Sequence, residues 1–261
     1  LDPRELARRD AFFADASENG SRIQCISDSS LQLLEEHFPS SVGKTFRTYL
    51  PVQERLSGAC ENKIESESGV IASDGNYFFY PANFWPHKNH ETLLEAYSIY
   101  LASLVDSEPW KLVLTGADST GRSDEIKSLA EAAGCAESVH LLGYVSNIEL
   151  DLLWRNASAL VFPSRHEGFG IPILEAMRYG VPIICSSVYS LTEVAGEAAL
   201  YFDPIVPEEI SEAMRKISSE PETGSELVNK GKERIGLFDP AKEARVLIEE
   251  WRRTAGKPVQ G

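Results

Sequence analysis

The chain has 261 residues, of which 43% are hydrophobic and 25% are charged, as is typical of a folded globular protein with at least one large core. Its formal net charge of -15 argues against a nucleic acid as partner and against general attraction to anionic lipid. No apolar run reaches the roughly 18 residues that span a bilayer, and the charged first residues are not typical of a signal peptide.

Residues 1–58 predict a strand–helix–strand unit. A strand is expected over 22–27, followed by the helix "DSSLQLLEEHF" with Asp28 or Ser29 as its N-cap. The segment "KTFRTYLPV" predicts a second strand that ends at Pro51. Such a small unit cannot bury the faces of its own strands, so we expect it to lean on other structure.

Residues 77–261 predict one α/β domain, preceded by a polar, turn-rich linker at 59–76. Apolar runs that predict strands lie at 77–82, 111–116, 138–143, 158–164, 181–187 and 198–203. Segments with helical spacing lie between them, one of which follows Ser123 as a candidate N-cap. This alternation predicts a Rossmann-like parallel β-sheet with helices on both faces. The near-continuous apolar runs are typical of strands that are buried on both sides.

The four cysteines are Cys25, Cys60, Cys135 and Cys185, and no two of them form a C-x-x-C pair. Cys25 lies inside an apolar run, and Cys185 ends another. We therefore expect buried, reduced thiols rather than disulfides or a metal site.

Ligands of an open parallel sheet bind outside the carboxyl ends of its strands, so the loops after the strands matter most. The first loop, at 83–90, places His87 and Lys88 beside a helix start for which Asn89 is a candidate N-cap. A cation is unfavourable at a helix N-terminus unless an anion such as phosphate lies between them. The alternative is a solvated lysine and a loop histidine. His87 and His90 alone are weak evidence for a metal site.

A second loop reads "SRHEGFGIPILEAM" and leads into a helix expected over 171–179, with Pro172 at its start. Glu167 lies just before the two glycines, and Glu175 lies about one turn inside the helix. Two carboxylates so placed can accept hydrogen bonds from two separate sets of ligand hydroxyls. The alternative is that Glu167 favours the positive helix end and Glu175 is merely exposed.

The remaining loops carry weaker signals. Gly143 and Tyr144 end a strand, and Asn147 is a candidate cap for the next helix. The loop at 115–124 contains Gly116 but lacks the G-K-[ST] of a Walker loop. No G-x-G-x-x-G follows the first strand, which disfavours a nicotinamide-dependent dehydrogenase.

The segment "EGFGIPILEAM" is similar to the E-x7-E signature of family 4 of the retaining glycosyltransferases, which have the GT-B fold. The segments "FWPHKNHETLLEAY", "KLVLTG" and "EVAGEAALYFDP" also follow the C-terminal domain of that family in order, over about residues 77–253. The resemblance implies that 77–261 is the domain that binds a nucleotide sugar, with a last helix that crosses back to the N-terminal domain. Residues 1–58 then resemble only a remnant of the N-terminal, acceptor-binding domain.

The resemblance also implies roles for single residues. Glu175 matches the glutamate that binds the ribose hydroxyls, Glu167 the one that faces the donor sugar, and Lys88 the cation that neutralises the diphosphate. Glu167 and Lys88 are thus the catalytic candidates. The donor-binding candidates are Glu175, Gly168, Phe169, Gly170, Tyr144, Gly143, His87, Asn83 and Gly116. No cofactor and no metal are expected, because the chain has no D-x-D pair.

Two departures from the family pattern qualify this expectation. Asn83 stands where many members have an arginine, with His87 as a partial substitute. Most of the N-terminal domain is missing, so this chain by itself is expected to bind donor but to transfer poorly. A missing domain or a second copy would then cover residues 1–58 and the last helix.

The expected function is transfer of a hexose from a nucleotide sugar to a glycan or a lipid-linked acceptor. A cytoplasmic location is expected, with a membrane-peripheral one left open for a full-length protein. Three alternatives remain: a nucleotide-sugar-binding module without transfer activity, a GT-B epimerase or phosphorylase, and a flavodoxin-like or dehydrogenase domain with a chance E-x7-E.

Overall fold

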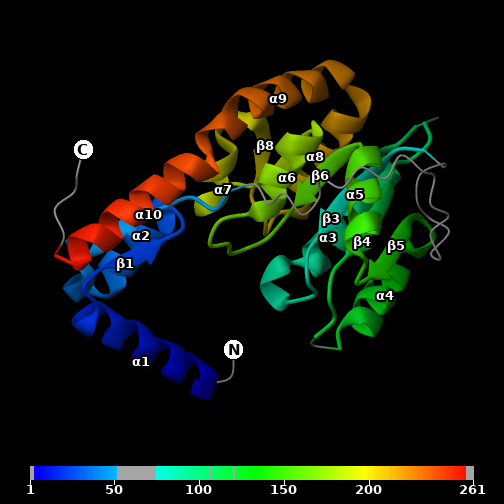
Figure 1. The fold of residues 1–261 in the computed structure, drawn as a ribbon. Coiled ribbons are helices and arrows are strands. Elements are labelled where there is room, and N and C mark those ends of the chain that lie inside the picture. Colours follow the sequence, from blue (N-terminus) through cyan, green and yellow to red (C-terminus); the bar gives the residue numbers. More distant parts are fainter. Residues whose placement is uncertain (1–2, 52–74, 106, 120, 257–261) are drawn as a thin grey trace. The chain divides into compact units, whose positions relative to one another are not determined.

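The structure is a computed structural model that describes residues 3–51, 75–105, 107–119 and 121–256 (Figure 1). The chain divides into two compact units, one formed by residues 1–51 and 237–261 and the other by residues 52–236. Each unit is described by itself. Cys60 and the linker predicted at 59–76, apart from Gly75 and Asn76, lie outside the described residues.

The larger unit contains a parallel sheet in which the order of the six strands is β5-β4-β3-β6-β7-β8. The strands are β3 (Tyr77–Pro81), β4 (Lys111–Thr115), β5 (Val139–Gly143), β6 (Ala159–Phe162), β7 (Ile183–Ser186) and β8 (Ala199–Phe202). The α-helices are α3 (His90–Ser103), α4 (Ser123–Ala132), α5 (Asn147–Asn156), α6 (Ile171–Tyr179), α7 (Ser190–Ala195), α8 (Pro207–Ser219) and α9 (Pro221–Arg234). Short 3-10 turns are η3 (Pro86–Lys88), η4 (Ala136–Ser138), η5 (Gly196–Ala198) and η6 (Ile235–Leu237). The predicted Rossmann-like fold is confirmed.

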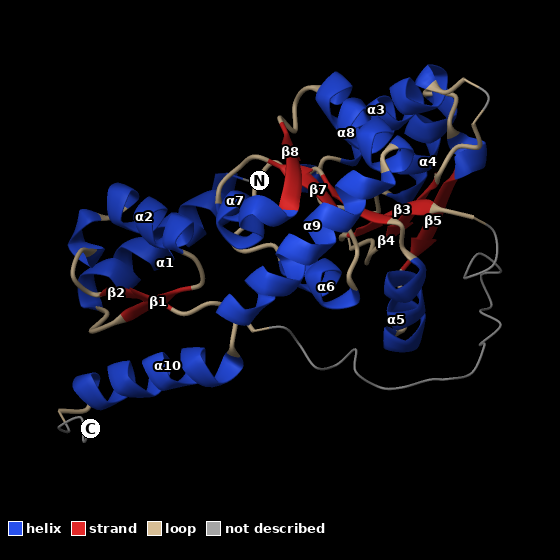
Figure 2. Cartoon of the chain, turned by 90° about the horizontal axis from the view of Figure 1, so that it is seen from above, coloured by secondary structure: helices blue, strands red, loops and turns tan. Residues whose placement is uncertain are grey.

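Helices cover both faces of this sheet, with α3, α4 and α8 on one side and α5, α6 and α9 on the other (Figure 2). Strand β3 shows how the sequence builds this core. Phe78 contacts Tyr100 of α3 edge-on, whereas the next residue, Phe79, contacts Trp154 of α5. Successive side chains of a strand point to opposite faces, so two adjacent aromatic residues fill both layers. The prediction of strands buried on both sides is confirmed for β3, β4, β6 and β7.

The strand order reverses between β3 and β6. From β3 the chain proceeds outward to β4 and β5, then returns to β6 and proceeds to β7 and β8 on the other side. The register of the central pair places Phe78 opposite Ala159 and Phe79 opposite Leu160. At such a reversal the loops diverge and leave a crevice at the carboxyl ends of the strands, where open α/β sheets bind ligands.

The smaller unit contains α1 (Pro3–Asn19), β1 (Ile23–Cys25), α2 (Asp28–His37), the turn η1 (Pro39–Ser41), β2 (Thr45–Arg47) and α10 (Pro240–Thr254). Strands β1 and β2 pair in parallel, with α2 between them in the chain. The second strand ends at Arg47 rather than at Pro51. The reason lies at Tyr49, whose N–H donates to Glu243 of α10 at 2.8 Å instead of to a strand.

Helix α10 contacts this strand pair through charged groups. Its Glu250 lies 2.6 Å from Arg22, and its Glu243 lies 3.9 Å from Arg47. Both glutamates are buried, and they are seven residues apart on one face of the helix. Among the described residues, no helix is long and apolar enough to cross a membrane.

Two helix caps differ from the predictions. Ser27, not Asp28 or Ser29, caps α2, because its extended backbone lets its Oγ accept the Ser30 N–H at 2.9 Å. Helix α4 begins at Ser123, but the acceptor of the Ser123 N–H is the carboxylate of Asp118, at 2.9 Å.

Three cysteines lie in the described residues, and all three are free and buried, as predicted. Burial raises the pKa of the thiols of Cys25, Cys135 and Cys185. Each thiol therefore stays protonated at neutral pH and behaves as a small apolar side chain.

Candidate functional site

The loop after β3 is held by Asn89, which has the left-handed conformation (φ 64°). Its amide donates to the carbonyl oxygens of Pro163 at 3.0 Å and Pro204 at 2.7 Å, and its Oδ1 accepts from Thr92 at 2.8 Å. Asn89 thus stands at the predicted N-cap position but ties three segments together instead of capping α3. The turn at Pro86–Lys88 is fixed as a result.

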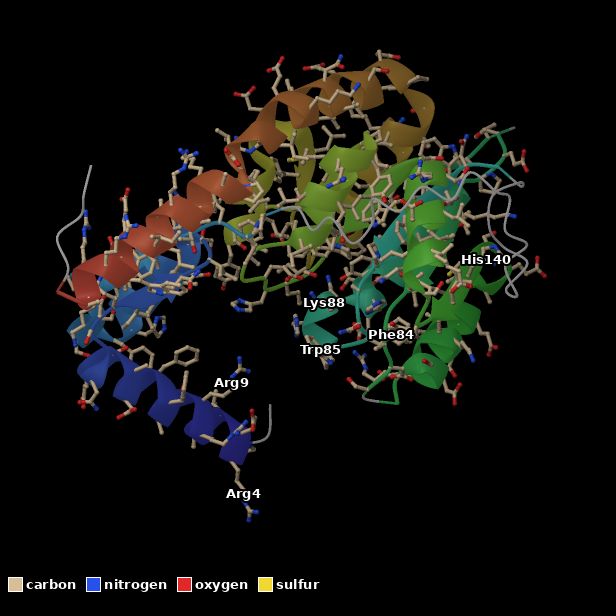
Figure 3. The ribbon with its side chains drawn as sticks, in the orientation of Figure 1. Arg4, Arg9, Phe84, Trp85, Lys88 and His140 are labelled. Carbon is tan, nitrogen blue, oxygen red and sulfur yellow. The ribbon has the colours of Figure 1, made fainter. Side chains whose placement is uncertain are left out.

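Lys88 ends this turn and reaches across the point where the strand order reverses. Its Nζ lies 2.5 Å from Oε1 of Glu167, which follows β6, and both side chains are largely buried. The Tyr80 hydroxyl donates to the Lys88 carbonyl at 2.7 Å, and the ring of Phe162 lies beside Nζ at 5.7 Å. The candidate cation and the candidate carboxylate are therefore paired with each other. Figure 3 shows Lys88 on its loop with Phe84 and Trp85.

The turn that carries Glu167 requires its second glycine. Gly170 has φ 93°, and a Cβ on it would lie 2.6 Å from Cδ2 of Leu191. The hydroxyl of Ser190, at the start of α7, donates to the Glu167 carbonyl at 3.1 Å. Phe169 is buried with 3% exposure, so its side chain anchors the turn in the core. Helix α6 begins directly after this turn, and its first residues, Ile171 and Pro172, line the cavity described next.

A cavity of about 350 Å³ lies beside the pair, at the carboxyl ends of β3, β4 and β5. Of the predicted donor-site residues it is lined by Asn83, Lys88, Gly116, Tyr144 and Glu175. The others, which are His87, Gly143, Glu167, Gly168, Phe169 and Gly170, are not among its lining residues. A larger hollow of about 650 Å³, lined by Asn76, Trp110 and Lys232 among others, is formed largely by α8, α9 and residues next to strand starts, away from these groups.

Glu175 lies on the wall of this cavity and is only 4% exposed. The alternative that it is merely an exposed helix residue is therefore wrong. A carboxylate at such a site is suited to accept hydrogen bonds from ligand hydroxyls, because it has about four acceptor positions.

The sequence reasoning missed Trp85, Asn147 and Leu150, which also line the cavity. It assigned Asn147 as the cap of α5. In the structure Ser146 caps α5 and forms a capping box with Glu149, so Asn147 is the first helical residue and its side chain lines the cavity. The S-x-x-E pattern of "SNIE" was the signal that could have placed the cap at Ser146.

The loops after β3 and β4 are joined at the rim of the cavity. The Oδ1 atom of Asn83 accepts the Ala117 N–H at 2.9 Å. Asn83, which stands where many family members have an arginine, therefore holds the two loops together. Gly116 has φ 155°, and a Cβ on it would lie 2.2 Å from the carbonyl oxygen of Ala82. Only glycine allows this close approach of the two backbones.

We predict that Gly116→Ala lowers the free energy of unfolding by about 2–4 kcal/mol, because the methyl group meets backbone atoms that cannot yield cheaply. Urea unfolding measures this loss. Gly121→Ala is the matched control in the same loop, since Gly121 also has a positive φ but open space around it, and it should cost about 1–2 kcal/mol. Equal losses for the two variants would contradict the close-approach argument.

The two histidines of the first loop are uncharged at neutral pH. Burial and the neighbouring Lys88 lower the pKa of His87. Burial lowers the pKa of His90 to about 4, and its ring lies between Tyr80 and Phe84. His87 therefore supplies no second positive charge at neutral pH. Within the described ranges, no group of three or more candidate ligands could hold a metal ion.

Comparison with known proteins identifies the family of this chain. Residues 61–234 match the family model described as "Glycosyl transferases group 1". The chain belongs to this family. It is 40% identical over 129 residues to O-antigen chain mannosyltransferase B of Escherichia coli, which is 49% of this chain and 33% of the relative. It is 30% identical over 251 residues to the serotype-specific mannosyltransferase WbdA of Escherichia coli, which is 95% of this chain and 29% of the relative.

These figures mean that the chain spans about a third of the length of these curated relatives. Solved structures agree on the fold. HepE of Anabaena, in complex with UDP and glucose, matches with a TM-score of 0.78 at 17% identity over 97% of this chain and 69% of that one. Sucrose-phosphate synthase of Thermosynechococcus elongatus matches with a TM-score of 0.76 at 21% identity over 98% of this chain and 62% of that one.

Proposed function

We infer that the larger unit of this glycosyl transferases group 1 chain binds a nucleotide sugar and serves the transfer of its hexose with retention of the anomeric configuration. The observation that carries this proposal is the Lys88–Glu167 pair, at 2.5 Å, beside a cavity lined by Glu175. A cation and two carboxylates then meet at the reversal of strand order, where such sheets bind nucleotides.

In this proposal each charged group binds a different part of the nucleotide sugar. Glu175 accepts hydrogen bonds from the ribose hydroxyls, and the wall formed by Tyr144 and the start of α5 receives the base. Lys88 leaves Glu167 and binds the diphosphate. Glu167 then faces the hydroxyls of the sugar near its anomeric carbon. The glycine turn before α6 brings backbone N–H groups to the phosphates.

The chemistry follows from where charge develops. The bond between the anomeric carbon and the diphosphate oxygen breaks, and the diphosphate leaves with the electron pair. An acceptor hydroxyl oxygen bonds to the carbon on the same face, and its proton passes to the departing diphosphate. A fixed ammonium group and backbone N–H groups of the glycine turn stabilise this developing negative charge without having to reorganise. These groups supply the stabilisation in our proposal, which includes no metal and no cofactor.

The names of the relatives suggest the substrates. O-antigen chain mannosyltransferase B and RfbU of Salmonella typhimurium are both named for mannosyl transfer to an O-antigen chain. We extend this to a mannose donor and a glycan or lipid-linked acceptor for the whole protein. A cytoplasmic location, membrane-peripheral in a full-length protein, belongs to the same proposal.

The smaller unit is, in this proposal, a remnant of the acceptor-binding domain. Phe12 on α1 and Trp251 on α10 are 67% and 64% exposed, which is unusual for large apolar side chains. Further chain of the missing domain, or a second copy, would cover them. Figure 3 labels Arg4 and Arg9 on the same helix α1.

The test is to titrate the chain with UDP, GDP and ADP by calorimetry in the absence of metal. We expect one nucleotide to bind, and Glu175→Ala to weaken its binding about tenfold to a hundredfold, since hydrogen bonds to a buried carboxylate are lost. Arg178→Ala, at an exposed position of the same helix, should leave the affinity within about twofold. Unchanged affinity in Glu175→Ala would refute the ribose role, and no binding of any nucleotide would refute the donor site.

A further inference from the structure

Helices α5 and α6 form two walls of the cavity. A hydrogen bond between Tyr179 and Asp151, here named the joint, connects the two helices one turn below the cavity. The hydroxyl of Tyr179, the last residue of α6, donates to Oδ1 of Asp151 in α5. Arg155 of α5 lies 2.7 Å from Oδ2 of the same carboxylate. Asp151 is 4% exposed, and burial alone would raise its pKa, but the hydrogen bonds from Arg155 and Tyr179 outweigh burial and lower it. The carboxylate therefore stays ionised at neutral pH and remains an acceptor for the tyrosine.

The spacing of these residues relates the contact to the cavity. Asn147 lies four residues before Asp151 on α5, and Glu175 lies four residues before Tyr179 on α6. Residues four apart in a helix share one face, about 6 Å along the axis. Asn147 and Glu175 line the cavity, so on each helix a cavity residue stands one turn above a residue of the joint.

The rest of α5 is fixed independently of α6. The Tyr77 hydroxyl of β3 donates to the carbonyl of Leu153 at 2.5 Å, and Trp154 contacts Phe79 of β3 edge-on at 4.9 Å. Trp154 also stacks on the Tyr179 ring, with an interplanar angle of 9° and centroids 5.9 Å apart. With α5 held by β3, the Tyr179–Asp151 bond and the Trp154–Tyr179 stacking connect the last turn of α6 to it.

We propose that Asp151 and Tyr179 are positioning residues that set the width of the nucleoside end of the donor site. The inference rests on the proposed function. The joint fixes the distance from the start of α5, which faces the base, to Glu175, which faces the ribose. The groups proposed for the diphosphate are held elsewhere: Lys88 lies on the loop after β3, and the glycine turn before α6 is held by the Ser190 hydroxyl and by the buried Phe169. Loss of the joint should therefore weaken binding of the nucleoside part and spare binding of the diphosphate.

The experiment compares two ligands by calorimetry, the nucleoside diphosphate that the wild-type chain binds and inorganic pyrophosphate. Tyr179→Phe keeps the ring that stacks on Trp154 and removes only the hydroxyl. We expect it to weaken nucleoside diphosphate binding about fivefold and to leave pyrophosphate binding within about twofold. Asp151→Ala should act in the same direction.

Two variants serve as matched controls. Arg155→Gln removes the other partner of the same carboxylate, on the same helix and half exposed, without touching the bond to α6. Asp151→Asn removes the charge but keeps an oxygen that accepts from Tyr179. Both should keep nucleoside diphosphate affinity within about twofold of wild type.

The outcomes separate the inference from the proposed function. Unchanged nucleoside diphosphate affinity in Tyr179→Phe would overturn the inference, as would an equal loss for pyrophosphate, which would indicate a general loosening of the fold. Failure of the wild-type chain to bind any nucleoside diphosphate would instead overturn the donor site itself. Tyr179→Phe keeps the test decisive even where Asp151→Ala does not fold.

Discussion

Lys88→Ala should weaken binding of a nucleoside diphosphate by about a hundredfold or more, the largest loss of affinity that we expect for any single change in the chain. The lysine is the cation of the Lys88–Glu167 pair. Its removal takes away the charge that meets the diphosphate and leaves a largely buried carboxylate facing that anion without its partner. Calorimetry with the nucleoside diphosphate and with the nucleoside alone measures the effect.

The comparison of the two ligands makes this prediction specific. The nucleoside lacks phosphate, so its affinity should change by less than about threefold in Lys88→Ala. Lys127→Ala is a matched control, since Lys127 is an exposed lysine on α4, and it should bind both ligands as the wild type does. Equal losses for nucleoside and nucleoside diphosphate would show that Lys88 supports the fold of the loop rather than the diphosphate.

Glu167→Gln should have opposite effects on catalysis and on binding. In the full-length protein we expect transfer to fall by about a hundredfold or more, because a carboxylate beside the reacting carbon is lost. Binding of the nucleoside diphosphate to the present chain should become tighter, by about threefold to tenfold. Glu167 accepts a hydrogen bond from Lys88 at 2.5 Å, so the carboxylate competes with the diphosphate for one ammonium group.

Net charge alone could tighten the binding of an anion, so a second glutamate serves as control. Glu197→Gln removes one negative charge at an exposed position of the same unit and should change affinity by less than about twofold. Weaker nucleoside diphosphate binding in Glu167→Gln would mean that Glu167 assists binding instead of competing with it. Unaltered transfer in the full-length protein would remove Glu167 from the catalytic candidates.

The fold could be predicted from the sequence because it is encoded in local patterns of apolar residues. Runs such as "YFFYPA" are apolar without a break, and such runs fit strands only when helices cover both faces. Helix α1 was not predicted, and the structure explains why. Its sequence, PRELARRDAFFADASEN, is rich in charged residues, and among those described Ser17 is its only buried residue. Glycine and proline around Glu167 likewise located the turn before α6 from sequence alone.

Pairings between distant residues could not be predicted in the same way. Lys88 and Glu167 are 79 residues apart, and Asp151 and Tyr179 are 28 residues apart. Each residue alone is compatible with an exposed charge or an ordinary helix position. Only the strand order, which places β3 beside β6, brings the first pair together. The spacing of motifs along the chain does not show which strands become neighbours in the sheet.

The reversal of strand order also has a consequence for folding. Strands β3, β4 and β5 are built from one continuous stretch of chain, but the pairing of β3 with β6 joins Phe78 to Ala159 and must close a long loop. Such pairings form late and slowly. An intermediate that contains only the first three strands would hold Lys88 without Glu167 or Glu175. The complete set of charged groups therefore exists only after the two halves of the sheet have joined.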